Sequence, residues 1–371
     1  MTLEKSRTWA EISLENIKHN VRAIKAALPE TTKFLGVVKA DAYGHGAVPA
    51  AKAILEAGAE YLAVACIAEA EELRSAGITA PILILGITPP YFVEKLGELD
   101  ISQAVPSLEY AEALSRYLSK PVRCHLKLDS GMGRTGFACR EESLVDIIEA
   151  LNMPGLEFEG VFTHFAVSDE PEEEFTVTQF NRFMSTIDAI EKMWGKSFAI
   201  KHCANSGAVI NFRDYALDMV RPGLMTYGMY PAAEKGGIEL RPAMSLRSMI
   251  YTISEHLPGD TISYGRTFTV DRPMRVAVVP IGYADGLSRC LSGKLEVLIH
   301  GKRCRQIGRI CMDMCMVDIT DVEGCDTGDI VTIIGCDGDD RILADELAEK
   351  QGSINYEVTC DVAPRVPRVY E

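Results

Sequence analysis

Several residues that could do chemistry follow short apolar runs of this 371-residue sequence. They are Lys39, Lys127, Arg134, His164 and Arg221. A lysine at the end of a buried apolar run has a lowered pKa, which makes its amine a usable nucleophile. Arginine binds carboxylates and phosphates through two parallel hydrogen bonds. The set therefore indicates a reactive amine beside groups that hold an anion.

Eight strand-like runs, which alternate with amphipathic helical segments, must position these residues. The runs cover residues 33–38, 61–65, 82–85, 101–105, 122–128, 156–163, 198–202 and 217–220. The helical segments between them include 50–57, 68–76, 108–118, 144–151 and 175–193. Such alternation predicts a parallel sheet, and eight units in about 200 residues favour a (β/α)8 TIM-type barrel over a doubly wound sheet.

Barrels of this kind keep their chemistry in the loops that follow the strands. The loops after the seventh and eighth predicted strands contain Ser206-Gly207 and Gly223-Leu224. A hydroxyl and backbone N–H groups at helix starts suit a phosphate dianion. A nucleophilic lysine, a phosphate cradle and an arginine together indicate pyridoxal 5′-phosphate, whose aldehyde forms a Schiff base with an amine.

The composition and the pattern of apolar residues change after Tyr230. Residues 231–238 contain proline, alanine and paired glycines, which is typical of a linker. Beyond it, alternating runs at 245–253, 261–270, 274–281, 295–299, 315–319 and 329–334 predict a mostly-β domain with one helix near 343–351. We therefore expect an α/β protein with a cofactor-binding barrel at 11–236. A β-rich C-terminal domain would follow at 237–371, with residues 1–10 pairing as a strand.

Composition excludes several classes of partner. The 38 Lys and Arg against 53 Asp and Glu give a net charge of −15, which argues against binding to nucleic acid. No run of 18 apolar residues is long enough to span a membrane. The 11 cysteines are odd in number and lack a C-x-x-C pair, and no signal peptide is evident, so we expect reduced thiols and a cytoplasmic protein. Metal is not expected, because no Cys/His quartet occurs.

One glycine pattern favours a different interpretation, namely a dinucleotide-binding site. Gly131, Gly133 and Gly136 form G-x-G-x-x-G after a strand, as in dinucleotide-binding folds. The pattern follows the fifth strand instead of the first, and good helix formers begin only five residues later. We therefore favour a substrate role for this loop, in which Arg134 clamps a carboxylate.

Seven motifs resemble those of the bacterial alanine racemases, which are pyridoxal-phosphate enzymes of fold type III. They are V-V-K-A-D-A-Y-G-H-G at 37–46, L-K-L-D-S-G-M-G-R-T-G at 126–136, H-C-A-N-S-G at 202–207, V-R-P-G at 220–223, S-Y-G at 263–265, G-Y-A-D-G at 282–286 and C-M-D-M-C-M at 311–316. The resemblance spans nearly the whole chain, from Trp9 to Glu357. It implies interconversion of L- and D-alanine, which supplies D-alanine for cell-wall peptidoglycan.

By that resemblance, Lys39 and Tyr264 would be opposed bases that act on the Schiff base of cofactor and substrate. Tyr264 would reach the site from the second subunit of a head-to-tail homodimer with shared active sites. The cofactor would be held by Lys39, Tyr43, His164, Asn205, Ser206, Arg221, Gly223, Leu224 and Tyr356. The substrate would contact Arg134, Met312 and Tyr283, and Lys127 matches a lysine that is often carbamylated in the family.

Other functions stay open at this stage. A basic amino-acid decarboxylase or a racemase for serine could use the same fold, although the segment at 37–46 and the Tyr264 motif favour racemisation. A single-barrel protein that carries the cofactor without catalysis would lack the β domain and its tyrosine.

Overall fold

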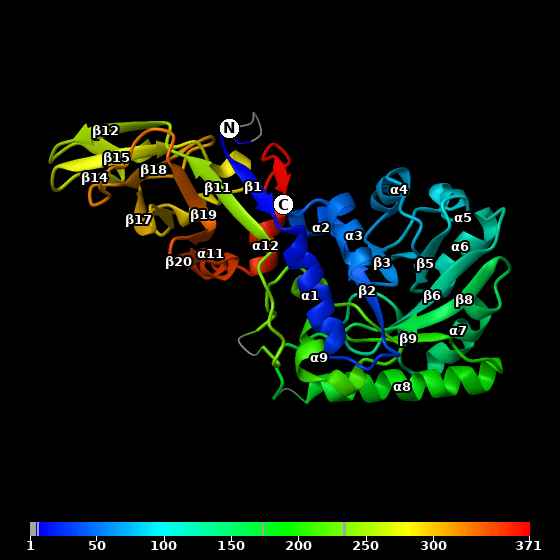
Figure 1. The fold of residues 1–371 in the computed structure, drawn as a ribbon. Helices are drawn as coiled ribbons and strands as arrows, with labels where there is room; N and C mark the ends of the chain where they lie inside the picture. The colour runs from blue at the N-terminus through cyan, green and yellow to red at the C-terminus, as the bar shows by residue number, and fades with distance from the viewer. Residues whose placement is uncertain (1–4, 6, 173, 233–234) are drawn as a thin grey trace. The chain divides into compact units, whose positions relative to one another are not determined.

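The computed structural model describes residues 5, 7–172, 174–232 and 235–371, and Figure 1 traces them along the chain. Their contacts divide the chain into two compact units. One, called the barrel unit, comprises Glu15–Ala42 and Ala47–Arg241. The other, called the β unit, comprises Met1–Leu14, Tyr43–Gly46 and Pro242–Glu371.

Eight parallel strands form the wall of the barrel unit within its described residues. They are β2 (Lys33–Val37), β3 (Tyr61–Val64), β4 (Ile82–Ile84), β5 (Ile101–Val105), β6 (Val122–Asp129), β8 (Leu156–Phe162), β9 (Ile200–His202) and β10 (Met219–Val220). Their order is β10-β2-β3-β4-β5-β6-β8-β9, and the short β7 (Phe137–Ala138) pairs with β6.

Hydrogen bonds beside β9 and β10 bring the two ends of this sheet together. The Asp218 N–H donates to the Lys201 carbonyl at 3.1 Å. The Arg221 N–H donates to the Ala204 carbonyl at 2.9 Å. The predicted (β/α)8 barrel is therefore confirmed, and each predicted strand overlaps an observed one.

Helices cover the outside of these strands, as Figure 1 shows for α3, α4, α6, α7 and α8. The helices are α1 (Leu14–Ala26), α2 (Lys39–Gly44), α3 (Ala47–Glu56), α4 (Ile67–Ser75), α5 (Glu94–Glu98), α6 (Leu108–Tyr117), α7 (Leu144–Leu151), α8 (Phe175–Trp194), α9 (Ser206–Asn211) and α10 (Gly223–Thr226). In α7, the buried residues Ile147, Ala150 and Leu151 recur every three to four positions, so one stripe faces inward. The Ser107 hydroxyl begins α6 by accepting the Tyr110 N–H.

The β unit is built around one large mixed sheet. Its strands are β1 (Trp9–Ile12), β11 (Met244–Met249), β12 (Thr252–His256), β15 (Met274–Val279), β16 (Glu296–Ile299), β17 (Lys302–Ile307), β18 (Cys315–Asp318), β19 (Ile330–Asp337), β20 (Asp340–Ile342) and β21 (Arg368–Tyr370). The order is β12-β15-β18-β17-β16-β19-β11-β1-β21, with β20 on β19. The early strand β1 pairs antiparallel with β11 and parallel with β21.

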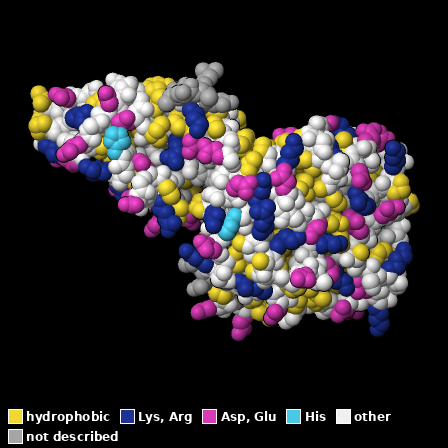
Figure 2. Space-filling model, viewed as in Figure 1, with side chains coloured by type: hydrophobic (Ala, Val, Ile, Leu, Met, Phe, Trp, Pro, Cys, Tyr) yellow, Lys and Arg dark blue, Asp and Glu magenta, His cyan; other side chains and the backbone are white. Residues whose placement is uncertain are grey.

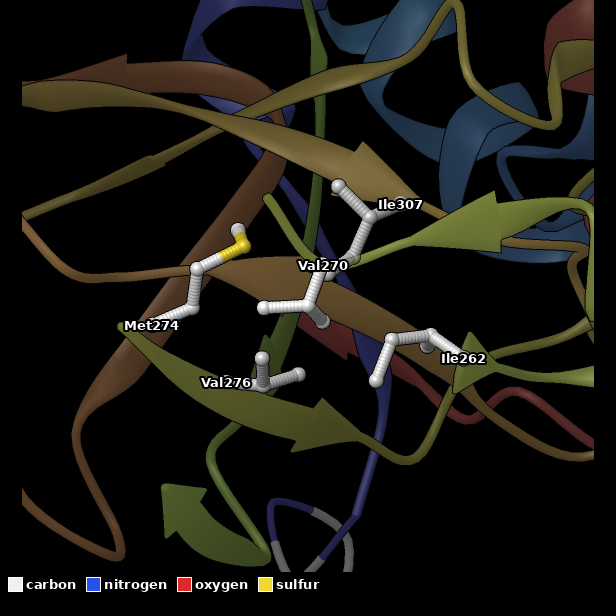
Figure 3. Packing of buried hydrophobic residues seen from close by; sticks show 5 residues of the cluster. All are labelled: Ile262, Val270, Met274, Val276 and Ile307. Carbon is white, nitrogen blue, oxygen red and sulfur yellow. The ribbon is translucent and has the colours of Figure 1, made fainter. Parts of the chain in front are cut away.

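Apolar side chains fill the space beside one end of this sheet. Figure 3 shows Ile262, Val270, Met274, Val276 and Ile307 pointing toward one another. Ile262 belongs to the small hairpin β13 (Thr261–Ile262) and β14 (Phe268–Thr269), so the cluster fastens that hairpin to the sheet. Two helices, α11 (Ala344–Gln351) and α12 (Asn355–Cys360), complete the unit, and α11 confirms the predicted helix near 343–351.

Two expectations for the β unit are wrong in detail, and a further strand was not predicted. The predicted strand at 261–270 is interrupted, because Ser263, Gly265 and Arg266 have φ angles of 67°, 74° and 50°, which end a strand. The predicted strand at 245–253 divides into β11 and β12. The sequence analysis missed β17, whose residues K-R-C-R-Q-I are mostly polar, so no apolar alternation marks the strand.

The surface and the thiols complete the description. On the face seen in Figure 2, Lys and Arg side chains are interspersed with Asp and Glu side chains. Among the residues that the structure describes, no helix is both long and apolar enough to cross a membrane. All 11 cysteines, which lie in the described part of the chain, carry free thiols. Part of the predicted linker, residues 233–234, lies outside the described residues.

Candidate functional site

A left-handed turn directly follows Lys39, which lies two residues beyond the end of β2. The φ angles of Ala40, Asp41, Ala42 and Tyr43 lie between 51° and 55°. Each non-glycine residue in this region costs about 1–2 kcal/mol, so four in a row need support from their surroundings. The sequence predicts polar residues here but not this backbone, since only Asp41 among the four is of a type that favours the left-handed region.

A glutamate supports the start of this turn. The Glu69 carboxylate accepts the Ala40 N–H at 2.8 Å and, through its other oxygen, the Ala65 N–H at 2.6 Å. It therefore ties the turn after β2 to the end of β3. The Asp41 carboxylate accepts the Ala47 N–H at 2.7 Å and fastens the far side. Lys39 thus sits at the C-terminal end of a barrel strand on a backbone that is held in place.

Positive charges gather around His164, which follows β8. Burial is the first reason why the pKa of His164 lies well below its usual value. The other reasons are cations that lie close enough to oppose its protonation: Arg221, Arg134, Lys127 and Lys39. The barrel therefore brings together the lysines, the arginines and the histidine that the sequence placed at separate strand ends, and it keeps the imidazole neutral.

Lys127 is the most deeply buried lysine of this group. Its side chain lies on the Phe162 ring, with Nζ 5.3 Å from the ring centroid, and Nζ donates to the Leu128 carbonyl at 2.7 Å. Burial, and then the charge of Arg221, lower the pKa of Lys127 to about 8. About a tenth of this amine is therefore uncharged at pH 7.

Arg221 is 4% exposed and donates from both terminal nitrogens. Nη1 donates to Nδ1 of His202 at 2.9 Å, and Nη2 donates to the Thr163 carbonyl at 2.8 Å. Nη2 also lies 3.3 Å from Nδ1 of His164. Burial lowers the pKa of Arg221 to about 10, so the guanidinium stays charged at neutral pH.

A carboxylate shapes the loop that presents Arg134. Oδ1 of Asp129 accepts the N–H groups of Gly131 and Gly133, and Oδ2 accepts the N–H of Arg134 at 3.0 Å. Burial raises the pKa of Asp129, but these three donors outweigh it and hold the pKa below its usual value. The glycine pattern therefore serves to wrap backbone around one carboxylate, and the Arg134 side chain is left exposed.

The loops after β9 and β10 lie against each other. Asn205 caps α9 by accepting the Ala208 N–H at 3.1 Å, and it also accepts the Ser168 hydroxyl at 2.6 Å. A Cβ at Gly207 would lie 2.7 Å from the Asp169 nitrogen, so only glycine fits there. The buried Ser206 side chain contacts the N–H of Met225 in α10 at 3.5 Å. The first N–H groups of a helix have no acceptor within it, and two helix starts meet here.

In the β unit, two predicted residues line one cavity of about 570 Å³. The cavity is lined by Ser263, Tyr264, Gly265, Cys311, Met312, Asp313, Met314 and Met316. The side chains of Tyr264 and Met312 are 69% and 52% exposed. The N–H groups of Tyr283 and Ala284 donate to the carbonyls of Cys311 and Met312, each at 3.0 Å, so Tyr283 is joined to the same segment.

The other two predicted residues of the β unit form an aromatic pair. The ring centroids of Tyr43 and Tyr356 lie 6.1 Å apart. Burial, followed by the influence of Tyr356, raises the pKa of the Tyr43 phenol, so it stays a hydrogen-bond donor. The predicted site residues are thus distributed over two sets. Lys39, Lys127, Arg134, His164, Asn205, Ser206, Arg221, Gly223 and Leu224 belong to the barrel unit, and Tyr43, Tyr264, Tyr283, Met312 and Tyr356 belong to the β unit.

Comparisons with known proteins agree over almost the full length. The family described as "Alanine racemase, N-terminal domain" matches residues 12–231, and "Alanine racemase, C-terminal domain" matches residues 243–370. An alanine racemase 2 from Caldanaerobacter subterraneus subsp. tengcongensis is 46% identical, covering 98% of this chain and 94% of that protein.

Solved structures give the same result. The alanine racemase of Clostridium difficile 630 superimposes with a TM-score of 0.93 at 43% identity, covering 100% of this chain and 96% of that one. The alanine racemase of Bacillus anthracis, solved with bound L-Ala-P, has a TM-score of 0.93 at 40% identity, covering 98% and 95% of the two chains.

Proposed function

Since the chain belongs to the alanine racemase family and is an isomerase, we propose that it interconverts L- and D-alanine with pyridoxal 5′-phosphate as cofactor and supplies D-alanine for peptidoglycan. Lys39 and Tyr264 are the two opposed bases of this proposal. The observation that carries it is the gathering of Lys39, Lys127, Arg134 and Arg221 around a neutral His164.

The donor set of the barrel fits the cofactor. Near Lys127, the carboxylate of Asp129 opposes the charges of Arg221 and Arg134, and its oxygens are already occupied by backbone donors. The site therefore has an excess of cations, which a phosphate and a phenolate oxygen balance. When bound, the cofactor supplies a conjugated ring that delocalises the electron pair left by removal of the α-proton.

Separate groups hold separate parts of the cofactor in this proposal. Ser206, Gly223 and Leu224 would hold the phosphate, where the starts of α9 and α10 meet. The phenols of Tyr43 and Tyr356 donate to the same group, and the raised pKa of Tyr43 suits a donor. Arg221 would face the ring nitrogen, His164 would pack against the ring, and Asn205 would line the pocket.

Racemisation needs a base on each side of the α-carbon. The Lys39 amine takes or returns the proton on one side, and the Tyr264 phenol does so on the other. Tyr264 is exposed in this chain, so we propose that it serves the site of a second copy in a homodimer. A phenol with a normal pKa near 10 needs a nearby positive charge to act as a base, and the His164–Arg221 pair supplies it.

The substrate carboxylate is bound by Arg134 and by the Met312 backbone of the second copy in the homodimer, while Tyr283 narrows the entrance. Lys127 has a pKa of about 8, so its free amine is available to react with carbon dioxide. The resulting carbamate places a negative charge beside Arg134 and orients its guanidinium. We also propose a cytoplasmic location, which suits the free thiols of all 11 cysteines.

An absorbance spectrum and a circular-dichroism assay test the proposed function. Purified protein is expected to absorb near the visible edge, to lose this band on reduction with borohydride, and to racemise L-alanine and D-alanine. L-serine, run in parallel, measures how strictly the site selects the smaller side chain. Protein that carries the cofactor but leaves the optical rotation of alanine unchanged would contradict the proposal.

A further inference from the structure

A continuous chain of hydrogen bonds runs through the barrel interior and ends on Arg221. Nδ1 of His202 accepts from Arg221 at 2.9 Å, and Nε2 of His202 lies 2.9 Å from Nδ1 of His125. Nε2 of His125 then lies 3.3 Å from Oε1 of Glu159. The hydroxyl of Ser102 donates to the same carboxylate oxygen at 3.0 Å. Glu159, His125 and His202 have no part in the two-base reaction described above.

Because Arg221 can only donate and Glu159 can only accept, the two ends of the chain determine which nitrogen of each histidine carries the proton. Arginine can only donate, so Nδ1 of His202 is an acceptor and its proton is on Nε2. That proton is donated to Nδ1 of His125, so the proton of His125 is also on Nε2. It is donated to Glu159, which as a carboxylate can only accept. All donors therefore point the same way, from Arg221 to Glu159, and both imidazoles are neutral.

The pKa shifts of these groups agree with this assignment. Burial, followed by the charge of Arg221, holds the pKa of His202 well below its usual value. Burial also lowers the pKa of His125, although Glu159 opposes the shift. Burial raises the pKa of Glu159, but the hydrogen bonds from His125 and Ser102 and the nearby positive charges together outweigh it and hold the pKa below its usual value, so the carboxylate is ionised.

The chain compensates for an unusual feature of Arg221. In the described part of the protein, its guanidinium contacts only neutral acceptors, namely two imidazole nitrogens and two backbone carbonyls. A buried cation normally needs a counter-ion. The two imidazole rings are aligned as dipoles between Glu159 and Arg221. Through them, the negative charge of Glu159 stabilises the guanidinium without placing a carboxylate beside the cofactor ring.

The surrounding packing is shaped to hold the two rings. A Cβ at Gly160 would lie 2.3 Å from Nδ1 of His125, so glycine leaves the space that this imidazole occupies. The Phe162 ring stacks on His202 with centroids 4.9 Å apart and an interplanar angle of 12°. His202 and His125 meet edge to face at 5.0 Å. Both rings are therefore kept in the orientation that the hydrogen bonds require.

We propose that Glu159 and His125 are positioning residues that act through His202 to hold Arg221 charged and correctly oriented in the site. This inference rests on the proposed function for the role of Arg221, but the hydrogen-bond chain can be measured without any reaction.

The direct test is nitrogen NMR of the holoenzyme labelled with ¹⁵N-histidine. The sequence has only 7 histidines, and substitution of each by glutamine assigns the signals. At neutral pH, His125 and His202 are both expected to carry one proton, on Nε2. A proton on Nδ1 of either ring, or two protons on either ring, would overturn the chain. If the tautomers are as expected but alanine is not racemised, the proposed function fails while the hydrogen-bond chain stands.

Variants of Glu159 test its effect on the site. Glu159→Leu removes the final acceptor, so we expect both histidine signals to change and kcat to fall about tenfold, with KM changed less than about twofold. Glu159→Gln keeps an oxygen acceptor and is expected to recover most of kcat. Glu157→Leu is the matched control, since Glu157 is exposed on the same strand, and it is expected to match the parent.

The outcomes that contradict the proposal are specific. Histidine signals that do not change in Glu159→Leu would show that the chain does not end on this carboxylate. Equal kcat values for Glu159→Leu, Glu159→Gln and the parent would show that the chain does not affect the site. Gly160→Ala gives an independent check, because its added methyl group must displace the His125 ring without removing a polar atom.

Discussion

The two sets of candidate site residues are built in opposite ways. In the barrel unit, Arg221 and Lys127 are buried, and hydrogen bonds within one chain fix them. In the β unit, Tyr264 and Met312 are largely exposed at an open cavity. The barrel set is thus preorganised by its own chain. The exposed set is consistent with a surface that completes a site only when a second copy covers it, and the predictions below test this difference.

The largest effect is expected from Lys39→Ala. The variant loses the only amine placed on the left-handed turn, so we expect it to lose the absorbance near the visible edge and essentially all racemisation. Lys52→Ala, an exposed lysine in α3, is the control and should match the parent. Turnover by Lys39→Ala close to that of the control would remove Lys39 from the mechanism.

A smaller loss, of about 10² to 10⁴ in kcat, is expected from Tyr264→Phe. Only one face of the α-carbon loses its base, so proton exchange should be impaired more for one enantiomer of alanine than for the other. Deuterium uptake from solvent into each enantiomer measures this asymmetry. Tyr251→Phe removes another exposed phenol of the β unit and serves as the control. Equal impairment for both enantiomers would argue against Tyr264 as a one-sided base.

The third prediction concerns the stability of the β unit, which carries the exposed residues Tyr264 and Met312. Asp285 is fully buried and accepts from Arg7, Arg365 and the Gly282 N–H. Asp285→Asn should lower the free energy of unfolding of the β unit by about 3 kcal/mol, because the buried side chain loses its charge-assisted hydrogen bonds with Arg7 and Arg365. Asp313→Asn removes only an exposed partner of Arg365 and should cost less than about 1 kcal/mol. Urea unfolding measures the loss of unfolding free energy in each variant. Equal losses in the two variants would show that burial of Asp285 has no effect.

The Asp285 carboxylate should also make the stability of the protein depend on pH. Burial raises the pKa of Asp285, but the hydrogen bonds from Arg7 and Arg365 outweigh it and hold the pKa below its usual range. A carboxyl with a lowered pKa in the folded state stabilises the protein fully above its unfolded pKa of about 4. This contribution is lost as the pH falls through the lower, folded value. The stability difference between the parent and Asp285→Asn should therefore shrink below pH 4, and a constant difference would contradict the assignment.

The smallest effect is expected from Asp129→Asn in the barrel set. An amide accepts the N–H groups of Gly131 and Gly133 less strongly than a carboxylate does, so the Arg134 loop loosens. We expect KM for alanine to rise about tenfold while kcat changes little. Asp146→Asn, on the exposed side of α7, is the control. A fall in kcat with KM unchanged would indicate that Asp129 contributes to the chemical step instead.

The alternation of strand-like and helical segments was enough to predict the barrel, because buried parallel strands are continuous apolar runs separated by amphipathic helices. The ends of those runs also predicted that Lys39, His164 and Arg221 follow barrel strands, the region where barrel enzymes keep their chemistry. The β unit was harder to predict. Its strand β17 is mostly polar because it is exposed along one side, and the turn at Tyr264 depends on backbone angles that the sequence pattern does not reveal.

Other features depend on three-dimensional contact. The left-handed turn after Lys39 is formed mostly by residues without a left-handed preference, and the hydrogen bonds from Ala40 to Glu69 and from Ala47 to Asp41 support it. His125 and Glu159 lie on separate strands, and no spacing in the sequence relates them. The glycine at 160 was the one local signal, because a strand glycine often marks a close approach of another group.

The central claim is that Lys39 of one copy works with Tyr264 of another. Equal amounts of the Lys39→Ala and Tyr264→Phe chains should be mixed, with subunit exchange verified by differently tagged chains. If each site is shared, half of the dimers are mixed and each has one intact site, so about a quarter of the parent activity should return. No recovery after proven exchange would contradict a shared site.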